Sequence, residues 1–564
     1  MKICDWLVER LIEEGVTDAF GIPGAVMLDF LYAMDRRRPA FTPHLNYHEQ
    51  GAAFSACGYA QATGGLCLAY ATRGPGFTNM LTAIADAYYD SLPVLFFTAH
   101  AAGLKKPGMR IEDNQEMDTV ALAAGITKYA ARVDRAEDVR PQLEKALAAA
   151  REGRKGPVVL DFRSSVFRQE IGEEQKTAPV PVPADPGPVK RIAEDIAQRV
   201  RAAARPVFLI GNGIRQAEAA AMMSRLAVHA GIPVLSSRVA QDVMPDSPYY
   251  YGFIGSHAAR CGNFILSKAD LIVGLGNRFS FPVRSPSFRP VMTNAATVRV
   301  DVDEGEFLRE VPNSVCHGAD LRALLPALLQ MDFSRLGKEH WLAVCGELRE
   351  ALRQWDMTPE IDLLMRIMRR AEPEDVFLCD VGNHSFWVTN AYAYAGMRNR
   401  ILYSGSLGTL GSALPKAIGA CFKGRRRVFC FTGDQGLQMN IQELQLISQE
   451  ALPVVIVVLN NRSSGMIRDR EAQLHAGHFV HTTPDSGYGM PDLRDISRAY
   501  RIEYRRAETL DTGELPDFKD GPCLLEVLVD EDAGLRPSLP YGNYCQDMAP
   551  SLPKELYERL NSLR

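Results

Sequence analysis

Two polar segments follow strand-like apolar runs in the last third of the chain. The run 428–432 leads into Asp434, and the run 454–459 leads into Asn461. Because neighbouring parallel strands end in one crevice, we expect this carboxylate and this amide to lie close together. Mg²⁺ prefers such oxygen ligands and shares them with phosphates. A helix predicted to begin near Asn440 would direct its positive end at the same ligand. The pattern indicates a site for Mg²⁺ and a diphosphate, although a Gly-Asp turn alone is a common strand-to-helix connection.

A second candidate for chemistry is Glu49 in the first third of the chain. It follows a predicted strand and begins an alanine-rich segment typical of a helix. A carboxylate at this position is often a helix cap. A buried carboxyl group with a raised pKa can instead exchange a proton with a bound ligand. The residues alone leave both roles open.

The elements that position these residues alternate between short apolar runs and helical periodicity. We predict helices at about 3–14 and 80–89, and strands at 67–71, 94–98, 158–161, 207–211, 232–235, 271–274, 297–302, 376–380, 427–432, 454–460 and 523–529. This alternation predicts an α/β fold with three domains. Each domain would be a doubly wound parallel sheet covered by helices on both faces.

Domain boundaries follow from composition. Five prolines lie between Lys176 and Lys190 and predict an extended linker. We expect domains at 1–170, 191–335 and 361–540, a linker at 171–190, a charged connector at 336–360 and a C-terminal tail at 541–564.

Composition excludes several classes of protein. The chain has 46% hydrophobic and 23% charged residues and a net charge of −5, which give no basis for binding nucleic acid or an anionic membrane. Its apolar runs are far shorter than the roughly 20 residues that span a bilayer. Asp5 and Glu9 interrupt any signal peptide. Eleven cysteines without a Cys-x-x-Cys pair indicate neither disulfides nor zinc, so we expect a soluble cytoplasmic protein.

Taken together, the two candidate segments resemble those of the thiamine-diphosphate (ThDP) enzymes. That family has a Gly-Asp-Gly motif followed by Asn-Asn, and Asn461 lies 27 residues after Asp434 here. The resemblance implies that Mg²⁺ is held by Asp434, Asn461 and the main-chain carbonyl of Ser463. Gln435 departs from the family's glycine, and Gly436 follows it.

The resemblance extends to the glutamate segment. Glu49 matches the family's catalytic glutamate, which hydrogen-bonds N1′ of the cofactor so that its 4′-amino group can take a proton from C2. Leu410 would hold the bent cofactor and the Gly408 carbonyl would bind the amino group, although Leu410 is equally typical of a core residue. The other cofactor-binding residues that the resemblance implies are Pro23, Gly24, Thr72, Asn79, Asn383, His384, Gly433, Gln435, Gly436, Gly465 and Met466.

Within this family the chain is most similar to acetohydroxyacid (acetolactate) synthase. The resemblance implies a pyrimidine-binding first domain, a Rossmann-like middle domain and a diphosphate-binding third domain. It gives Gln115 a catalytic role and Arg278 contact with the acceptor's carboxylate. Arg470 stands where the synthase has a tryptophan, so it is either a substrate residue or part of a solvated charged loop. FAD binding stays open, because Gly211–Gly213 is also typical of a plain turn.

The expected function is therefore that of a carboligase, which decarboxylates a 2-oxoacid such as pyruvate and joins the product to a second carbonyl compound. A homodimer would share its sites, with Glu49 from one chain and Asp434 from the other, and two dimers could pair as a homotetramer. One alternative is a decarboxylase or oxidase that forms no new carbon–carbon bond. The other is an inactive cofactor-binding regulatory subunit, against which Glu49 and both metal ligands argue.

Overall fold

The structure is a computed structural model. It describes residues 1–101, 108–110, 113–172, 187–334, 338–422, 424–508 and 521–563, together with Gly513, Leu515, Asp517 and Phe518. The described residues of 1–179, 372–385 and 399–532 form one compact unit, and those of 180–371, 386–398 and 533–564 form a second. No helix in the described ranges combines the length and the apolar character needed to cross a bilayer.

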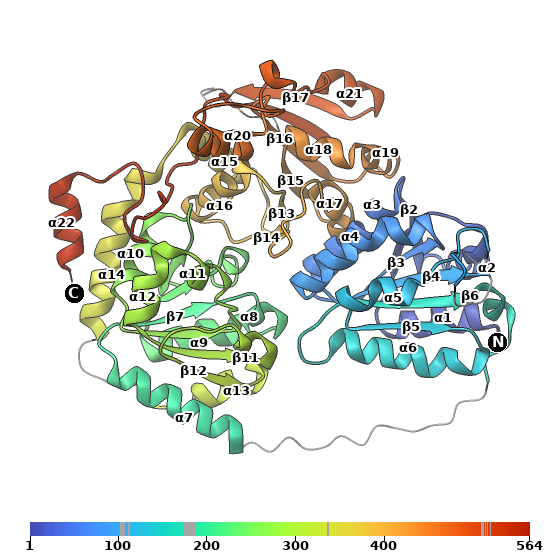
Figure 1. The fold of residues 1–564 in the computed structure, drawn as a ribbon, viewed down its shortest axis with the longest axis horizontal. Helices are drawn as coiled ribbons and strands as arrows, with labels where there is room; N and C mark the ends of the chain where they lie inside the picture. The colour runs from blue at the N-terminus through green and yellow to red at the C-terminus, as the bar shows by residue number, and fades with distance from the viewer. Residues whose placement is uncertain are drawn as a thin grey trace. The chain divides into compact units, whose positions relative to one another are not determined.

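Eighteen strands in the described residues form three parallel six-stranded sheets (Figure 1). The first has the order β2-β1-β3-β4-β6-β5 and consists of β1 (Asp18–Gly21), β2 (Thr42–Leu45), β3 (Cys67–Thr72), β4 (Val94–His100), β5 (Tyr129–Val133) and β6 (Val158–Arg163). The second, β12-β11-β10-β7-β8-β9, consists of β7 (Pro206–Ile210), β8 (Val234–Ser236), β9 (Tyr250–Phe253), β10 (Leu271–Leu275), β11 (Ala296–Asp301) and β12 (Ser314–Gly318). The third, β14-β13-β15-β16-β18-β17, consists of β13 (Val376–Cys379), β14 (Arg400–Tyr403), β15 (Val428–Gly433), β16 (Val454–Asn460), β17 (Glu503–Glu508) and β18 (Cys523–Leu528).

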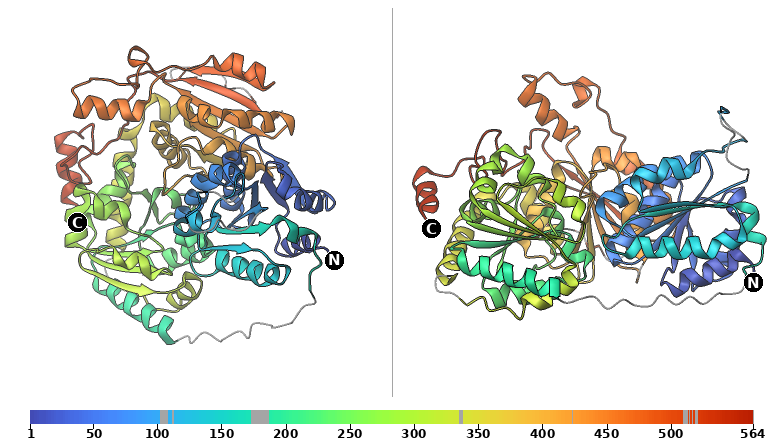
Figure 2. Two further views of the ribbon diagram at one scale, coloured as in Figure 1. Left: turned by 45° about the vertical axis from the view of Figure 1, so that its right-hand side comes forward. Right: turned by 60° about the horizontal axis from the view of Figure 1, so that its bottom comes forward.

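Helices cover the faces of each sheet (Figures 1 and 2). Those of the first domain are α1 (Ile3–Glu13), α2 (Leu28–Asp35), α3 (Glu49–Thr63), α4 (Pro75–Asp90), α5 (Thr119–Ala123) and α6 (Ala136–Arg151). The middle domain has α7 (Gly187–Ala202), α8 (Gly213–Gln216), α9 (Ala220–Ala230), α10 (Arg260–Lys268), α11 (Ser280–Arg284), α12 (Arg289–Asn294) and α13 (Leu321–Leu328). The rest are α14 (Lys338–Leu352), α15 (Pro359–Met368), α16 (Asn383–Ala395), α17 (Ala413–Phe422), α18 (Asp434–Met439), α19 (Leu444–Gln449), α20 (Gly465–Leu474), α21 (Leu493–Ala499) and α22 (Lys554–Ser562).

The strand orders confirm the predicted fold class. Counted from its first strand, the second sheet has the 3-2-1-4-5-6 order of a Rossmann fold, and the first and third sheets share one order with each other. In doubly wound sheets, ligands bind where the strand order reverses, at the carboxyl ends of the strands. In the first sheet this point lies between β1 and β3, and in the third it lies between β13 and β15.

The first and third sheets share one hydrophobic core through α3 and α17. Buried side chains of both helices and of both sheets form one cluster. The helices approach so closely that a Cβ atom on Gly58 would lie 2.0 Å from the Lys416 carbonyl oxygen, and one on Gly419 would lie 1.7 Å from that of Ser55. Because these two glycines have no side chains, α3 and α17 can pack closely and hold the two domains together in the first unit.

Two sequence predictions about element boundaries are wrong. The helix expected near Asn440 begins at Asp434 itself, and the segment at Asn440 continues as a short 3₁₀ turn, Ile441–Glu443. The linker expected to reach Lys190 ends earlier, because α7 begins at Gly187 and accepts Pro188 in its first turn. The remainder of that linker, 173–186, lies outside the described residues.

Candidate active site

Glu49 lies at the start of α3 and is held by a side chain from α4. Asn79 Nδ2 donates a hydrogen bond of 2.9 Å to Glu49 Oε2. Thr72, at the end of β3, lies beside Gly24 and Gly76, where added Cβ atoms would come within 2.7 Å and 3.0 Å of its side chain. The structure thus brings Gly24, Thr72, Asn79 and Glu49 together at the carboxyl edge of the first sheet. Glu49 is only half-buried in the single chain, so it lacks the buried environment expected for it.

Gln115 joins the same edge through Gly74, the residue before α4. A Cβ on Gly74 would lie 2.6 Å from the Gln115 carbonyl oxygen, and both residues have positive φ angles, +63° and +62°. A non-glycine residue in this conformation carries backbone strain that the surrounding structure must support. Nearby, Arg73 pairs with Glu116 and fixes this segment against β3. Pro23, by contrast, is exposed in the loop after β1.

Asp434 follows β15 and is almost completely buried. Its Oδ1 accepts a 3.0 Å hydrogen bond from the Gln435 amide, whereas its Oδ2 has no hydrogen-bond partner among the described residues. Burial raises the pKa of this carboxyl to about 6, although the Gln435 amide, the hydroxyl of nearby Tyr488 and the Arg462 amide act in the opposite direction. A buried oxygen without a partner is costly unless a ligand occupies it. Asp434 is therefore suited to hold a cation.

The Asn461 segment lies beside this carboxylate, because β15 and β16 pair from Val428 to Gly433. Ser464 Oγ donates to Gln435 Oε1 over 3.2 Å. A Cβ on Gly465 would lie 2.7 Å from Asn461 Nδ2 and 3.4 Å from Asn383 Nδ2, so these residues enclose one small space.

The side-chain oxygens around that space differ in their contacts. Asn461 Oδ1 accepts a 3.3 Å bond from the Ser463 amide, and Asn383 Oδ1 has no partner among the described residues. No three His, Cys, Asp or Glu side chains gather as a metal site within the described ranges. A metal at Asp434 would therefore depend on amide, carbonyl and ligand oxygens.

Asp380, which was not among the predicted site residues, organises this edge of the third sheet. It is buried at the end of β13 and accepts hydrogen bonds from the Gly411 amide at 3.0 Å and from Thr432 Oγ1 at 3.1 Å. Burial raises its pKa to about 6. A Cβ on Gly436 would lie 2.7 Å from Asp380 Oδ2, which gives this glycine a packing role. His384, one of the predicted residues, lies near Gly433: a Cβ atom added to Gly433 would lie 3.4 Å from His384 Nδ1.

The segment that carries Gly408 and Leu410 is anchored by a second cluster missed from the sequence. Asp86 of α4 accepts hydrogen bonds from Ser404 Oγ at 2.6 Å and Thr409 Oγ1 at 2.9 Å. Lys416 Nζ lies 2.5 Å from Asp86 Oδ2, and both side chains are fully buried. Burial acts to lower the pKa of Lys416, but the charges of Asp86 and Asp90 outweigh it and raise that pKa. Leu410 is half-buried and Gly408 is exposed, with a φ of +70°.

The remaining predicted residues are more exposed. Met466 and Arg470 both lie on α20, and among the described residues Arg470 has one side-chain hydrogen bond, of 3.5 Å to Gln473. Arg470 thus lies on a helix and not in the expected loop. Arg278 belongs to the second unit, where its carbonyl accepts a 2.6 Å hydrogen bond from Arg309.

Comparison with known proteins decides the family. Three descriptions match successive parts of the chain: "Thiamine pyrophosphate enzyme, N-terminal TPP binding domain" at 1–122, the central domain at 193–328, and the C-terminal TPP binding domain at 380–527. The acetolactate synthase large subunit of Lactococcus lactis is 30% identical over 96% of this chain and 95% of its own length. The isozyme 2 large subunit of Escherichia coli acetolactate synthase is 30% identical over 98% of this chain and 100% of its own length. The probable acetolactate synthase large subunit of Methanocaldococcus jannaschii is 30% identical over 100% of this chain and 99% of its own length.

The chain belongs to the ThDP-dependent enzymes. Its three domains correspond to the N-terminal, central and C-terminal domains of that family, and ThDP is its cofactor. The predicted resemblance to acetolactate synthases is confirmed.

The residues present fit this cofactor. Glu49 with Asn79 offers a carboxyl group at the edge of the first sheet, and Asp434 offers a buried oxygen without a partner at the edge of the third. The middle domain is different. A Cβ on Gly211 would lie 2.1 Å from the Gly276 carbonyl oxygen, and one on Gly213 would lie 2.6 Å from Gly276 Cα. Close backbone packing therefore explains these glycines.

Proposed function

We propose that this ThDP enzyme is a carboligase, which decarboxylates a 2-oxoacid of the pyruvate type and joins the remaining acyl unit to a second carbonyl compound. The observation that carries the proposal is the Glu49–Asn79 pair beside a glycine-lined edge of the first sheet. The names of the full-length relatives, acetolactate synthases, support the reaction class. A regulatory subunit without activity would not need this carboxyl group.

In the proposed mechanism Glu49 holds a proton at N1′ of the aminopyrimidine. Asn79 fixes one oxygen of the carboxyl group, which leaves Oε1 as the atom that can face the cofactor. When bound, ThDP supplies the electron sink for the cleavage next to the carbonyl group. Gln115 and the Gly408 carbonyl would orient the substrate and the cofactor's amino group. These roles need fixed geometry more than they need charge.

We further propose that Mg²⁺ binds at Asp434. The unpartnered Oδ2 of Asp434, the amide oxygen of Asn461 and the carbonyl of Ser463 are hard oxygen ligands that would hold the ion together with the cofactor's diphosphate. Asn383 Oδ1 also lacks a partner among the described residues and borders the same space. We assign Asn383 to the diphosphate end of the cofactor.

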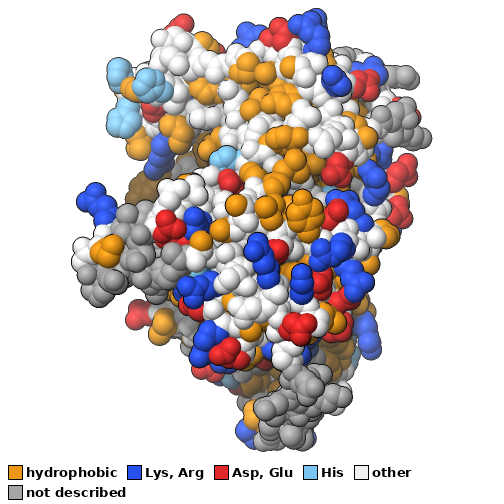
Figure 3. All heavy atoms as spheres, turned by 90° about the vertical axis from the view of Figure 1, so that its right-hand side faces the viewer, with side chains coloured by type: hydrophobic (Ala, Val, Ile, Leu, Met, Phe, Trp, Pro, Cys, Tyr) orange, Lys and Arg blue, Asp and Glu red, His pale blue; other side chains and the backbone are white. Residues whose placement is uncertain are grey.

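The active unit in this proposal is a homodimer whose sites combine Glu49 of one protomer with Asp434 of the other. Two observations support it. Glu49 is half-buried in the single chain, so a second chain can complete its surroundings. Apolar side chains are also gathered over a broad part of one face (Figure 3), a feature typical of interaction surfaces.

A mixing experiment tests the shared site. Glu49→Gln and Asp434→Ala chains are each expected to be inactive alone. If sites are shared, half of the reassociated dimers are hybrids with one intact site of two, so an equal mixture should recover about a quarter of wild-type activity. If each site forms within one chain, the mixture recovers nothing and the dimer proposal is wrong.

Arg470 is the residue that bears on the choice of acceptor. Arg470 provides a fixed charge with five donors, suited to a carboxylate or phosphate, and its exposed position leaves the guanidinium available. We propose that the preferred acceptor is not 2-oxobutyrate but a larger or anionic carbonyl compound. The alternative is that Arg470 belongs to a solvated helix face, where it contacts Gln473 at 3.5 Å.

Product analysis tests the reaction itself. Purified enzyme with ThDP, Mg²⁺ and pyruvate is incubated alone, with an aldehyde, or with an anionic ketone, and the products are identified by mass spectrometry. A carboligase yields coupled products of both substrates. Release of acetaldehyde alone would instead identify a decarboxylase, and acetate would identify an oxidase. Absorbance near 450 nm in the same preparation would reveal a bound flavin, which the proposal does not require.

A further inference from the structure

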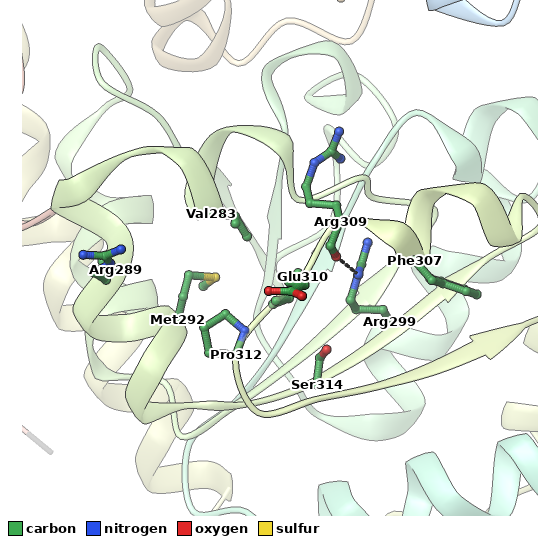
Figure 4. A pocket seen from close by; sticks show the side chains of 10 residues that line it. Val283, Arg289, Met292, Arg299, Phe307, Arg309, Glu310, Pro312 and Ser314 are labelled. Atoms are coloured by element: carbon green, nitrogen blue, oxygen red, sulfur yellow. Dashed lines mark hydrogen bonds between the residues drawn. The ribbon is translucent and has the colours of Figure 1, made fainter.

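The middle domain contains a cavity of about 590 Å³ that none of the residues assigned to catalysis lines (Figure 4). Val283, Arg289 and Met292 line one side of it. The other side is formed by β11 and by the segment that leads into β12. The full lining consists of Val283, Arg289, Met292, Arg299, Phe307, Arg309, Glu310, Val311, Pro312 and Ser314.

The distinguishing residue of this cavity is Arg299, whose side chain is 2% exposed. Its Nη1 donates to the Arg309 carbonyl at 2.7 Å and its Nη2 to the Glu306 carbonyl at 2.6 Å. Its Nε has no hydrogen-bond partner among the described residues, and its contacts there include no carboxylate. A buried cation paired only with carbonyl groups keeps most of its charge uncompensated.

Two more arginines line the cavity, against one acidic residue among the lining residues that the structure describes. Arg309 is paired with Glu306, Arg289 is exposed, and the acidic residue, Glu310, is exposed as well. The guanidinium of Arg299 also lies 5.4 Å from the centre of the Phe307 ring. Apart from Ser314, the other lining residues are apolar, so the cavity presents an anion-binding point at Arg299 beside a surface for a nonpolar group.

We propose that this cavity is a binding site for a small organic anion. A carboxylate or phosphate would approach Nε of Arg299, with Arg309 as a second donor, because guanidinium groups bind such oxygens with charge-assisted hydrogen bonds. Val283, Met292 and Val311 would contact its apolar body. The volume falls within the range of small-molecule sites, roughly 300–1,000 Å³, and is much larger than a free phosphate requires.

A ligand in this cavity would contact Arg309, which is hydrogen-bonded to the backbone of Arg278. Arg309 Nη1 donates to the Arg278 carbonyl at 2.6 Å and pairs with Glu306 Oε2 at 3.1 Å. An anion that engages Arg309 would compete for the donor that holds this carbonyl. A ligand here would therefore change the hydrogen bonding of the Arg278 backbone, and the binding site itself does not depend on the carboligase proposal.

Calorimetric titration of the full-length protein with ThDP and Mg²⁺ tests the site. The probes are phenyl phosphate, benzoate and inorganic phosphate. We expect at least one of the two aromatic anions to bind about 10-fold or more tightly than inorganic phosphate, and the tighter one identifies the preferred anionic group. Arg299→Met should weaken that binding about 10-fold or more, since it removes a charge-assisted contact. The control Arg322→Met, on an exposed arginine that pairs with Asp320, should leave it unchanged.

A second variant keeps the test valid if Arg299→Met does not fold. Ser314→Glu places a carboxylate in the lining, where it can pair with Arg299 and compete with any ligand. It should keep or raise the melting temperature while it abolishes binding of the aromatic anion. The proposal is overturned if neither aromatic anion binds the wild-type protein, if inorganic phosphate binds as tightly, or if Ser314→Glu binds the probe as the wild type does.

Discussion

Replacement of Lys416 by methionine should destabilise the first unit strongly. Lys416 and Asp86 are 1% and 0% exposed, and the 2.5 Å contact between them is the only one that gives Asp86 a counter-charge within the described residues. Removal of one partner from a buried pair leaves an uncompensated charge, at a cost of about 3–5 kcal/mol. For a domain of 150–250 residues this corresponds to a fall in melting temperature of at least about 6 °C. Methionine keeps the length of the side chain, so lost packing adds little.

Differential scanning fluorimetry at one heating rate measures this change, because a chain of this size need not unfold reversibly. Lys554→Met is the matched control, since Lys554 is 85% exposed and 3.9 Å from Glu558. Asp86→Asn combined with Lys416→Met should recover part of the loss, since Asp86 then carries no unpaired charge, whereas the buried Asp90 still loses the charge of Lys416. ThDP affinity should fall in the single variant, because Thr409 is bonded to Asp86. A single variant that melts within about 2 °C of the Lys554→Met control would refute the reasoning.

Four further outcomes are expected. Glu49→Gln should lower turnover by about 10²-fold or more while ThDP binding, measured by fluorescence titration, stays near normal; full turnover would exclude the acid–base role. Asp434→Ala should weaken Mg²⁺ binding, and an unchanged Mg²⁺ requirement in the same titration would place the metal elsewhere. Burial raises the pKa of Glu443 to about 7, above the ordinary value of 4.5, so its stabilising contribution is present below pH 4.5 and is lost as the pH rises through 7. Relative to wild type, Glu443→Gln should therefore gain up to roughly 3 kcal/mol of stability between pH 5 and pH 8, and its melting temperature should rise with it. Plots of melting temperature against pH that stay parallel for the two proteins would contradict the burial effect. Arg470→Trp should shift product formation from mixed substrates toward coupling of two pyruvates, and an unchanged product ratio would leave Arg470 without a role in acceptor choice.

The central strands of each sheet could be predicted from the sequence because they are buried on both faces. The run 454–460, for example, is apolar throughout until its last residue and coincides with β16. Edge strands such as β2, β5 and β17 have few buried side chains and no continuous apolar run, so nothing in a local window distinguishes them from loops. The early start of α18 was missed for a related reason, since Gly433, Asp434 and Gly436 are all typical of turns.

For the site, local motifs located the Glu49 and Asp434 segments but not the groups that support them. The contact between Asp86 and Lys416 joins residues 330 positions apart, and no spacing rule connects them. Asp380 could have been found, because it ends a predicted strand, as Asp434 follows one. Its role is to hold the Gly411 amide and Thr432, which only the fold reveals. The closeness of Gln115 to Gly74 is likewise a property of the backbone path.

The tight seam between α3 and α17 also bears on how the polypeptide is made. When α3 leaves the ribosome, the face that its glycines shape for α17 has no cover, because Ala413 lies about 350 residues further along the chain. At roughly 5–20 residues per second, translation of that interval takes about 20–70 s. During this time an apolar helix surface stays open to solvent and to other nascent chains. Chaperones should therefore bind this protein after the first domain has been synthesised and before α17 has. A fragment that ends before residue 413 should aggregate.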